Sequence, residues 1–447
     1  MKKFIETLSN IWKIEELRRR ILVTLGLLLV YRFGAQVVLP GIDTSQLANL
    51  ASNAGDGILG LLNAFTGGAF ANASVFALGI MPYISASIVV QLMSIAIPYL
   101  QKLDKEGESG RKTKNQITRW LTIAICIVQA PAYLYGLEAL GVPNSAFVLG
   151  KGLDFIIPAV VILVTGCVFA MWLGEKITDK GIGNGISLLI MIGIIATMPQ
   201  SFVQEFISRT TNNTGGLMFI LIELIVWFLV ILASVLLVMA VRQIPVQYAR
   251  RSASGGYEKN ITGSRQYIPL KLNASGVMPI IFAQAIMFAP SLIGRTFNDT
   301  AFGQWMEVQF ADIFGLAYNI LFAVLIIIFT YFYTAITVPT NKMADDLKRS
   351  GGFIPGIRPG KETGDFLDKI MSLITFPGSI FLAALAVLPA VVVKLMDVQA
   401  GWALFYGGTS LLIMVGVAID TVQQVNSYLL NRHYDGLMKT GKNRKVA

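Results

Sequence analysis

Ten long apolar runs, separated by polar connections rich in glycine and proline, dominate the pattern of the chain. Each run approaches the roughly 20 residues that a helix needs to cross a bilayer core about 30 Å thick. We therefore predict ten transmembrane helices, over residues 21–38, 74–97, 117–137, 155–173, 182–198, 217–241, 277–293, 313–338, 374–393 and 403–422. The connections leave no room for a large soluble domain, so the sequence predicts an all-α integral membrane protein.

One apolar stretch between the first two predicted helices departs from this pattern. Residues 57–73, here called the interrupted segment, are broken by Gly67, Gly68 and Asn72. The segment is too short to cross a bilayer alone, and irregular backbone at membrane depth is tolerated only inside protein or against a watery cavity. We expect it to lie within the helix bundle. An interfacial turn on the outer surface is the alternative that the sequence leaves open.

Composition agrees with the membrane class, since 54% of the 447 residues are hydrophobic, 14% are charged and the mean hydropathy is +0.64. The positions of the Lys and Arg residues indicate how the chain is oriented in the membrane. With the N-terminus in the cytosol, thirty-one of the 36 Lys and Arg residues fall in the N-terminal segment, the even-numbered connections and the tail. Four fall in the odd-numbered connections (Lys151, Arg209, Arg295 and Lys394), and Arg32 lies inside the first helix. By the positive-inside rule, both termini are expected in the cytosol.

Two of the connections on the cytosolic side, residues 242–272 and 339–371, are long, basic and rich in turn residues. They are candidate docking surfaces for a partner. Equally, they could serve as orientation signals alone, because positive loops need no partner.

The sequence offers little support for an enzyme. Paired carboxylates, a Ser/His/Asp set and a Walker loop are all missing at workable spacing, and GIGNG at residues 181–185 lacks the Lys-Ser/Thr of a phosphate-binding loop. Cys126 and Cys167 fall inside apolar runs and the single histidine, His433, lies in the tail, so no metal cluster or cofactor site is expected. We predict a protein without catalytic residues and without a cofactor.

An ion-coupled solute transporter is the second hypothesis. Such a protein would hold acidic groups near the membrane midplane. Here Glu138, Glu175 and Asp420 lie near helix ends, and Glu223 lies in the outer third of the sixth helix. These positions weaken the transporter hypothesis but do not exclude it.

A polar seam runs through the second predicted helix. Ser85, Ser87 and Gln91 are too polar to face lipid without partners, so they should face neighbouring helices or a pore. Ile80 and Ile84 are four residues apart, on one face of the same helix. A pore and ordinary helix packing explain these features equally well.

Seven stretches closely resemble the SecY/Sec61 family, in order along the whole chain and at the family's spacing. They are GIMPYISAS (residues 79–87), KEGESGRK (105–112), WLGEKITDKGIGNGIS (172–187), IPVQYARR (244–251), PLKLN (269–273), SGGFIPGIRPG (350–360) and GGTSLLI (407–413). The chain is most similar to the bacterial branch. The resemblance implies a protein-conducting channel that moves unfolded preproteins across the bacterial cytoplasmic membrane and releases transmembrane segments into it.

The resemblance also implies the architecture: two pseudo-symmetric five-helix halves, residues 1–200 and 201–447, around an hourglass pore. By motif position, six aliphatic residues would form a constriction ring: Ile80, Ile84, Ile190, Ile194, Ile281 and Ile413. The interrupted segment would be the plug, with Leu61, Leu62, Phe65, Gly67 and Gly68. A lateral gate toward lipid would include Ser85, Ser87, Gln91 and Asn273.

Partners are implied in the same way. Arg250, Arg251 and Arg358 would dock the ribosome and its RNA or the SecA motor, which drive transport. SecE and SecG subunits, signal peptides, nascent chains, YidC, SecDF and the lipid bilayer are further expected partners. The chain departs from the pattern at Gln243, where many relatives carry another Arg, and this leaves the contact at that position open.

Overall fold

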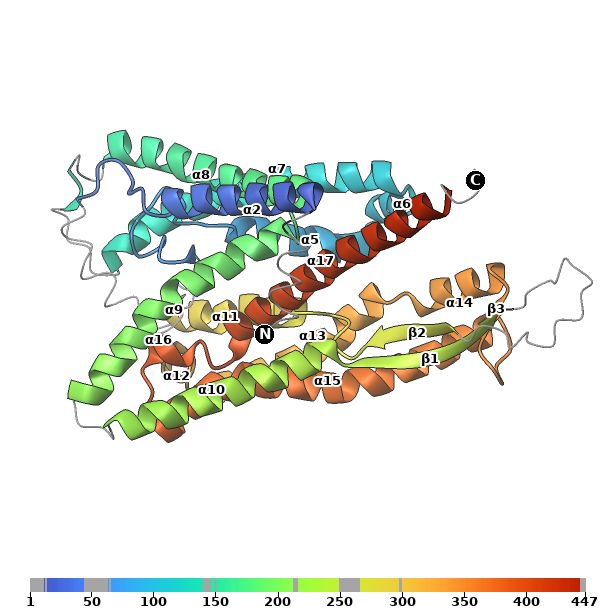
Figure 1. The fold of residues 1–447 in the computed structure, drawn as a ribbon. Helices are drawn as coiled ribbons and strands as arrows, with labels where there is room; N and C mark the ends of the chain where they lie inside the picture. The colour runs from blue at the N-terminus through green and yellow to red at the C-terminus, as the bar shows by residue number, and fades with distance from the viewer. Residues whose placement is uncertain are drawn as a thin grey trace, which may run out of the picture. The chain divides into compact units, whose positions relative to one another are not determined.

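The computed structural model describes residues 14–43, 66–139, 146–148, 152–211, 216–248, 266–296 and 300–442, together with Trp12, Asn63 and Gly150. The described chain is mostly helical (Figure 1), as the apolar pattern predicts. It divides into two compact units. Unit 1 comprises Met1–Thr214, Gln399–Trp402 and Val417–Ala447, and unit 2 comprises Gly215–Val398 and Ala403–Gly416.

Unit 1 is built around helices from the first half of the chain. Its described elements are α2 (Glu15–Gly34), α5 (Met81–Ala96), α6 (Pro98–Lys105), α7 (Glu108–Ala139), α8 (Leu153–Lys180), α9 (Gly185–Thr211) and the later part of α17 (Gly408–Lys442). Its apolar core joins Leu137 of α7 to Phe155 and Leu163 of α8, with Leu39 and Ala77 from the irregular chain between α2 and α5. The core therefore buries the non-helical backbone that follows α2.

Unit 2 combines helices with the strands of the chain. Its described elements are α10 (Gly216–Met239), β1 (Val241–Tyr248), β2 (Gln266–Lys271), α11 (Met278–Thr296), α12 (Ala301–Ala311), α13 (Leu316–Thr337), α14 (Thr340–Arg349), β3 (Gly352–Phe353), α15 (Lys361–Met396) and the start of α17. The short helix α16 (Ala400–Ala403) is divided between the units. The long helix α15 packs against α13 and α14.

Each of the ten predicted runs overlaps a helix of the structure. Within the described residues, seven helices are long and apolar enough to cross a membrane, and Met81–Ser94 and Met278–Met287 are shorter apolar helices. The class of protein is therefore confirmed, whereas the count of ten spans is not.

The second helix begins later than the prediction of residue 74. Residues 74–80 form turns, and Ser74 pairs with Val38 in an isolated β-bridge. Gly79 has a φ of 56°, which interrupts a right-handed helix, and Pro82 then stands in the first turn of α5, where its missing N–H costs nothing. Apolar composition alone concealed this boundary.

The expectation of an all-α chain missed a small sheet. Three antiparallel strands lie in the order β2-β1-β3, with Ile244 opposite Ile268. In β1, Ile244 and Val246 are buried while Arg242, Gln243 and Pro245 are exposed. This period of two was present in the sequence, but it occupies only a few residues inside a connection that reads as polar and basic.

Candidate functional site

At Gly67, the interrupted segment lies against α9. The structure describes Asn63 and residues 66–73 of it, so the predictions for Leu61, Leu62 and Phe65 lie outside the described residues. Gly67 and Gly68 have φ values of 65° and 88°, which glycine adopts without strain. A Cβ atom built on Gly67 would lie 2.7 Å from the Cα of Gly193 in α9. The backbones of the two segments therefore touch at this point.

Hydrogen bonds hold this part of the chain in a defined conformation. The side-chain oxygen of Asn63 accepts the N–H of Ala71 at 3.0 Å, and the hydroxyl of Tyr133 in α7 donates to the carbonyl of Phe70 at 2.8 Å. Ala71 and the neighbouring Ala69 are buried. Residues 66–73 are thus packed inside unit 1 rather than forming a turn on its surface.

The six aliphatic ring candidates divide between the two units. In unit 1, Ile190 and Ile194 are buried one turn apart on α9, on either side of Gly193 in the sequence. Ile80 is buried at the N-cap of α5, and Ile84 is half-buried one turn later. The N–H of Ile84 donates to the carbonyl of Ile80 at 3.1 Å. In unit 2, Ile413 is buried in α17 and Ile281 is half-buried in α11. Unit 1 thus brings two ring candidates next to the segment predicted to plug the pore.

Three of the four lateral-gate candidates lie on α5. Ser85, Ser87 and Gln91 are half-buried, and Ser87 and Gln91 line a cavity of about 340 Å³ together with Arg111 and Lys114 of α7. The ammonium group of Lys114 donates to the hydroxyl of Ser94 at 3.0 Å. Cationic and polar side chains therefore meet at this end of α5.

The fourth gate candidate lies in unit 2. Asn273 follows β2 in a turn, where its side-chain oxygen accepts a hydrogen bond from the hydroxyl of Ser275 at 3.3 Å. Its relation to the three residues on α5 stays a prediction.

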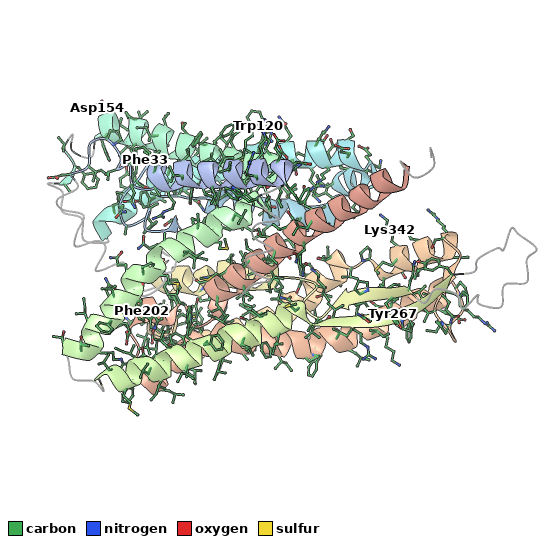
Figure 2. All side chains as sticks on the ribbon, in the orientation of Figure 1. Phe33, Trp120, Asp154, Phe202, Tyr267 and Lys342 are labelled. Atoms are coloured by element: carbon green, nitrogen blue, oxygen red, sulfur yellow. The ribbon has the colours of Figure 1, made fainter. Side chains whose placement is uncertain are left out.

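The described parts of the two basic connections pack together around one apolar core. We call this body the strand platform: β1, β2, β3, α14 and the first turns of α15. Its apolar core consists of Ile244, Val246, Leu270, Leu347, Ile354, Leu367 and Met371. Tyr267 of β2 and Lys342 of α14, labelled in Figure 2, are exposed on this body.

Arg358 is the one docking candidate that the structure describes. Its side chain is 87% exposed and lies 3.8 Å from Glu362, a contact that is weak at this distance. Its carbonyl accepts the hydroxyl of Thr363 at 2.8 Å, so the turn before α15 is fixed while the guanidinium faces solvent. Arg250 and Arg251 lie outside the described residues.

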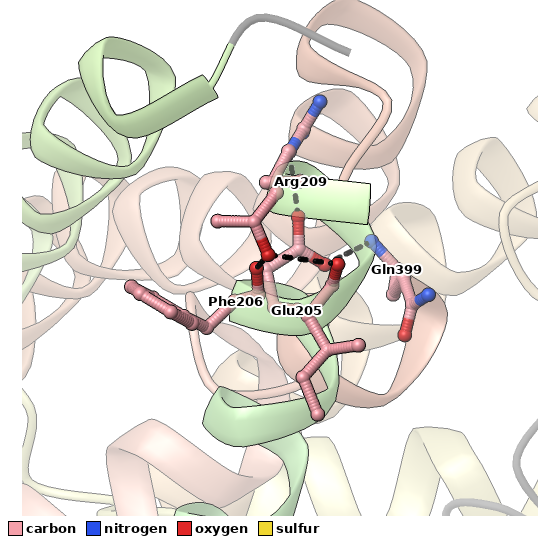
Figure 3. Close-up of polar contacts among 6 residues, drawn as sticks. Glu205, Phe206, Arg209 and Gln399 are labelled. Atoms are coloured by element: carbon pink, nitrogen blue, oxygen red, sulfur yellow. Dashed lines mark hydrogen bonds and ion pairs between the residues drawn. The ribbon is translucent and has the colours of Figure 1, made fainter. Parts of the chain in front are cut away.

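The sequence reading missed a buried ion pair on α9. Glu205 and Arg209 are 2% and 3% exposed, and Figure 3 shows both beside Gln399. By the apolar pattern alone, Arg209 belongs to an outer connection. The signal was the spacing of four residues, which pairs opposite charges once a helix continues this far.

No group of three or more His, Cys, Asp or Glu residues in the described part of the chain could hold a metal ion. The features that stand out in the described residues are apolar packing and an exposed charge. An aliphatic surface on α9 is covered by a glycine turn, and an exposed guanidinium stands on a rigid platform. These features suit a sealed passage and a docking point.

Comparisons with known proteins give the same direction. The family model that matches the chain is SecY, over residues 74–422. The protein translocase subunit SecY of Streptomyces scabiei is 37% identical over 443 residues, which cover 96% of this chain and 99% of the relative. The subunit SecY of Bacillus licheniformis is 38% identical over 439 residues, which cover 97% of this chain and 99% of the relative.

Solved structures share the fold. A protein conducting channel superposes with a TM-score of 0.60 at 17% identity, covering 92% of each chain. A second match is a SecY structure, with a TM-score of 0.60 at 18% identity over 92% of each chain. In that protein the plug domain stabilises the closed state of the translocation channel and maintains a membrane seal. Sec61 in the canine ribosome-channel complex from the endoplasmic reticulum superposes with a TM-score of 0.56 at 17% identity, again covering 92% of each chain.

Proposed function

Because this chain belongs to the SecY family, we propose that it is the channel-forming subunit through which unfolded preproteins cross the bacterial cytoplasmic membrane. Transmembrane segments would leave the same channel sideways into lipid. Family membership also displaces the solute-transporter hypothesis and agrees with the expectation of a protein that is no enzyme. The observation that carries the proposal is the contact of Gly67 with Gly193, between the ring candidates Ile190 and Ile194.

The proposed seal has two layers. Ile80, Ile84, Ile190, Ile194, Ile281 and Ile413 form a ring that offers no hydrogen bonds and excludes water and ions by dewetting. The interrupted segment covers that ring as a plug, and its packing on α9 supports this role. Aliphatic side chains then close loosely around any peptide that displaces the plug.

The proposed lateral gate consists of Ser85, Ser87, Gln91 and Asn273. Polar contacts between membrane helices contribute only about 0.6 to 2 kcal/mol each, so a signal helix can displace them. The cavity beside Ser87 and Gln91 supports a polar entry point at the end of α5. Signal peptides and nascent chains are the expected occupants.

The strand platform is the proposed docking point for a motor or ribosome. Arg358 presents a planar guanidinium to solvent, which binds RNA phosphate and acidic protein groups alike. The structural neighbour in the ribosome-channel complex supports a ribosome as partner. We propose the same role for Arg250 and Arg251, with SecA as the alternative motor.

The remaining assembly follows the family. We propose cytosolic termini, SecE and SecG as fellow subunits, and YidC and SecDF as further partners. We also propose the halves 1–200 and 201–447, and the division into two units supports a two-part body even though the end of α17 belongs with unit 1.

Reconstitution tests the proposal. The chain is placed in liposomes with SecE and supplied with SecA, ATP and a preprotein. We expect ATP-dependent protection of the preprotein from added protease. Protection that is equal without this chain, or without ATP, would contradict a motor-driven channel.

A further inference from the structure

Arg32 stands in the last turn of α2, in an otherwise apolar stretch. It is the one Lys or Arg inside the first predicted span. A charge at such a position is costly unless it is paired, so its partner indicates its role. The proposed function assigns no role to this residue.

The partner is the interrupted segment. The Nη1 atom of Arg32 donates to the carbonyl oxygen of Gly67 at 2.8 Å, across 35 residues of sequence. A Cβ atom on Gly67 would lie 2.5 Å from the same nitrogen and 2.7 Å from the Cα of Gly193. The Cβ position of Gly67 is therefore closed off by both the Arg32 guanidinium and the backbone of α9.

We propose that Arg32 is a positioning residue that latches residues 66–73 onto α9 through Gly67 and thereby keeps the channel closed. The inference rests on the proposed function, because it assigns a role within the same seal. Opening requires Gly67 to leave Gly193, and the charge-assisted bond to Arg32 must break when it does. Arg32 sets the balance between the covered and uncovered states of the ring.

A plainer account exists for a cation at this position. The C-terminal end of a helix carries partial negative charge, which favours a nearby arginine. That account requires charge but no contact with Gly67. It therefore predicts that the conformation of the interrupted segment is indifferent to the side chain at position 32.

The test uses the full complex in proteoliposomes and planar bilayers, without substrate. Asn72→Cys, in a background with Cys126→Ala and Cys167→Ala, reports the segment through its labelling rate with a membrane-impermeant maleimide. We expect Arg32→Met to raise this rate by at least about tenfold, as losing one charge-assisted hydrogen bond does to an equilibrium. Resting ion conductance should rise with it.

Arg20→Met is the matched control. Arg20 lies on the same helix and also donates to a glycine carbonyl, that of Gly181 at 3.3 Å, but no hydrogen bond joins it to the described residues of the interrupted segment. We expect its labelling rate and conductance to stay at the wild-type level. An equal rise in both variants would overturn a specific latch.

Two alanine variants test the close fit of Gly67 against Arg32 and Gly193 and leave residue 32 unchanged. Gly67 and Gly68 both have positive φ, so Ala strains the backbone at either position. Only at Gly67 would the new Cβ meet Arg32 and Gly193, since at Gly68 the nearest heavy atom is the Asn72 side chain at 3.8 Å. We expect Gly67→Ala to resemble Arg32→Met, and Gly68→Ala to have a smaller effect. The Arg32→Met/Gly67→Ala double variant should leak no more than the stronger single variant.

The variant Ile190→Ser/Ile194→Ser distinguishes a failure of the Arg32 latch from a failure of the proposed seal. If it conducts at rest while Arg32→Met and Gly67→Ala stay silent and label slowly, the latch is wrong and the proposed channel stands. If the serine variant is folded, inserted and also silent, the proposed seal itself is wrong.

Discussion

The carboxylate of Glu205 accepts the Nε–H of Arg209 at 2.8 Å, one turn along α9, and its second oxygen accepts the backbone N–H of Gln399 at 2.9 Å (Figure 3). Phe202 of α9 packs edge-on against Trp402, with ring centroids 5.2 Å apart. The short stretch Gln399–Trp402 is thus fixed to α9 within unit 1. The buried carboxylate of Glu205 therefore holds the backbone at Gln399 against α9.

Removing this carboxylate should be costly. Glu205→Ala leaves the buried guanidinium of Arg209 without its ion-pair partner, and breaking a buried pair in this way costs about 3 to 5 kcal/mol. We expect a clear fall in the thermal unfolding midpoint of the purified protein in lipid nanodiscs. Removing both charges with Glu205→Leu/Arg209→Met should cost less than the single change.

The chain supplies a control with the same spacing. Glu108 and Lys112 are also four residues apart, but their side chains are 86% and 79% exposed and 3.8 Å apart. Glu108→Ala should leave the unfolding midpoint almost unchanged, because exposed pairs contribute little. Equal losses from Glu205→Ala and Glu108→Ala would show that burial at Glu205 is unimportant.

The orientation can be tested on one helix. At 1.5 Å per residue, the 36 residues of α15 extend about 54 Å, well beyond the bilayer core. Lys361 and Lys394 stand exposed near its two ends. We expect Lys361→Cys to react with an impermeant maleimide only in inverted vesicles, and Lys394→Cys only in intact cells.

The two native cysteines are buried, so they give little background in this experiment. Labelling of Lys361→Cys from outside intact cells would overturn the charge-based orientation and, with it, the cytosolic position of the strand platform.

Docking depends on the exposed guanidinium of Arg358. Arg358→Glu reverses that charge without touching the platform core, so the variant should fold and insert normally. We expect motor- or ribosome-driven translocation to fall by about tenfold, the effect of losing a central interface arginine. Lys394→Glu, an exposed charge reversal at the other end of α15, should translocate normally. Full activity of Arg358→Glu at wild-type abundance would remove this residue from the docking surface.

The sequence predicted the helices well because spanning length and apolar composition are local properties. The resemblance named Ile190 and Ile194, and their spacing of four residues puts them one turn apart on α9. The apolar pattern placed the start of the second helix seven residues too early, since the turn at Gly79 depends on a conformation that composition does not reveal.

The contacts that matter most for the site are long-range. Arg32 and Gly67 are 35 residues apart, and nothing in the residues between them marks the pair. The strand platform likewise joins two connections that are far apart in the chain, and Ile244 meets Leu367 only once both are folded. Pattern reasoning found the members of these sets but could not pair them.

The central claim is that aliphatic side chains seal a channel through this protein. Single-channel conductance in planar bilayers, without substrate, measures that seal directly. Replacing Ile80, Ile84, Ile190, Ile194, Ile281 and Ile413 in combination by Ser should raise resting conductance, whereas Leu or Val at the same positions should change it little. Deleting residues 57–73 should cause a milder leak, because the ring remains. A serine variant that is folded, inserted and as silent as the wild type would contradict the account and reduce these isoleucines to ordinary helix packing.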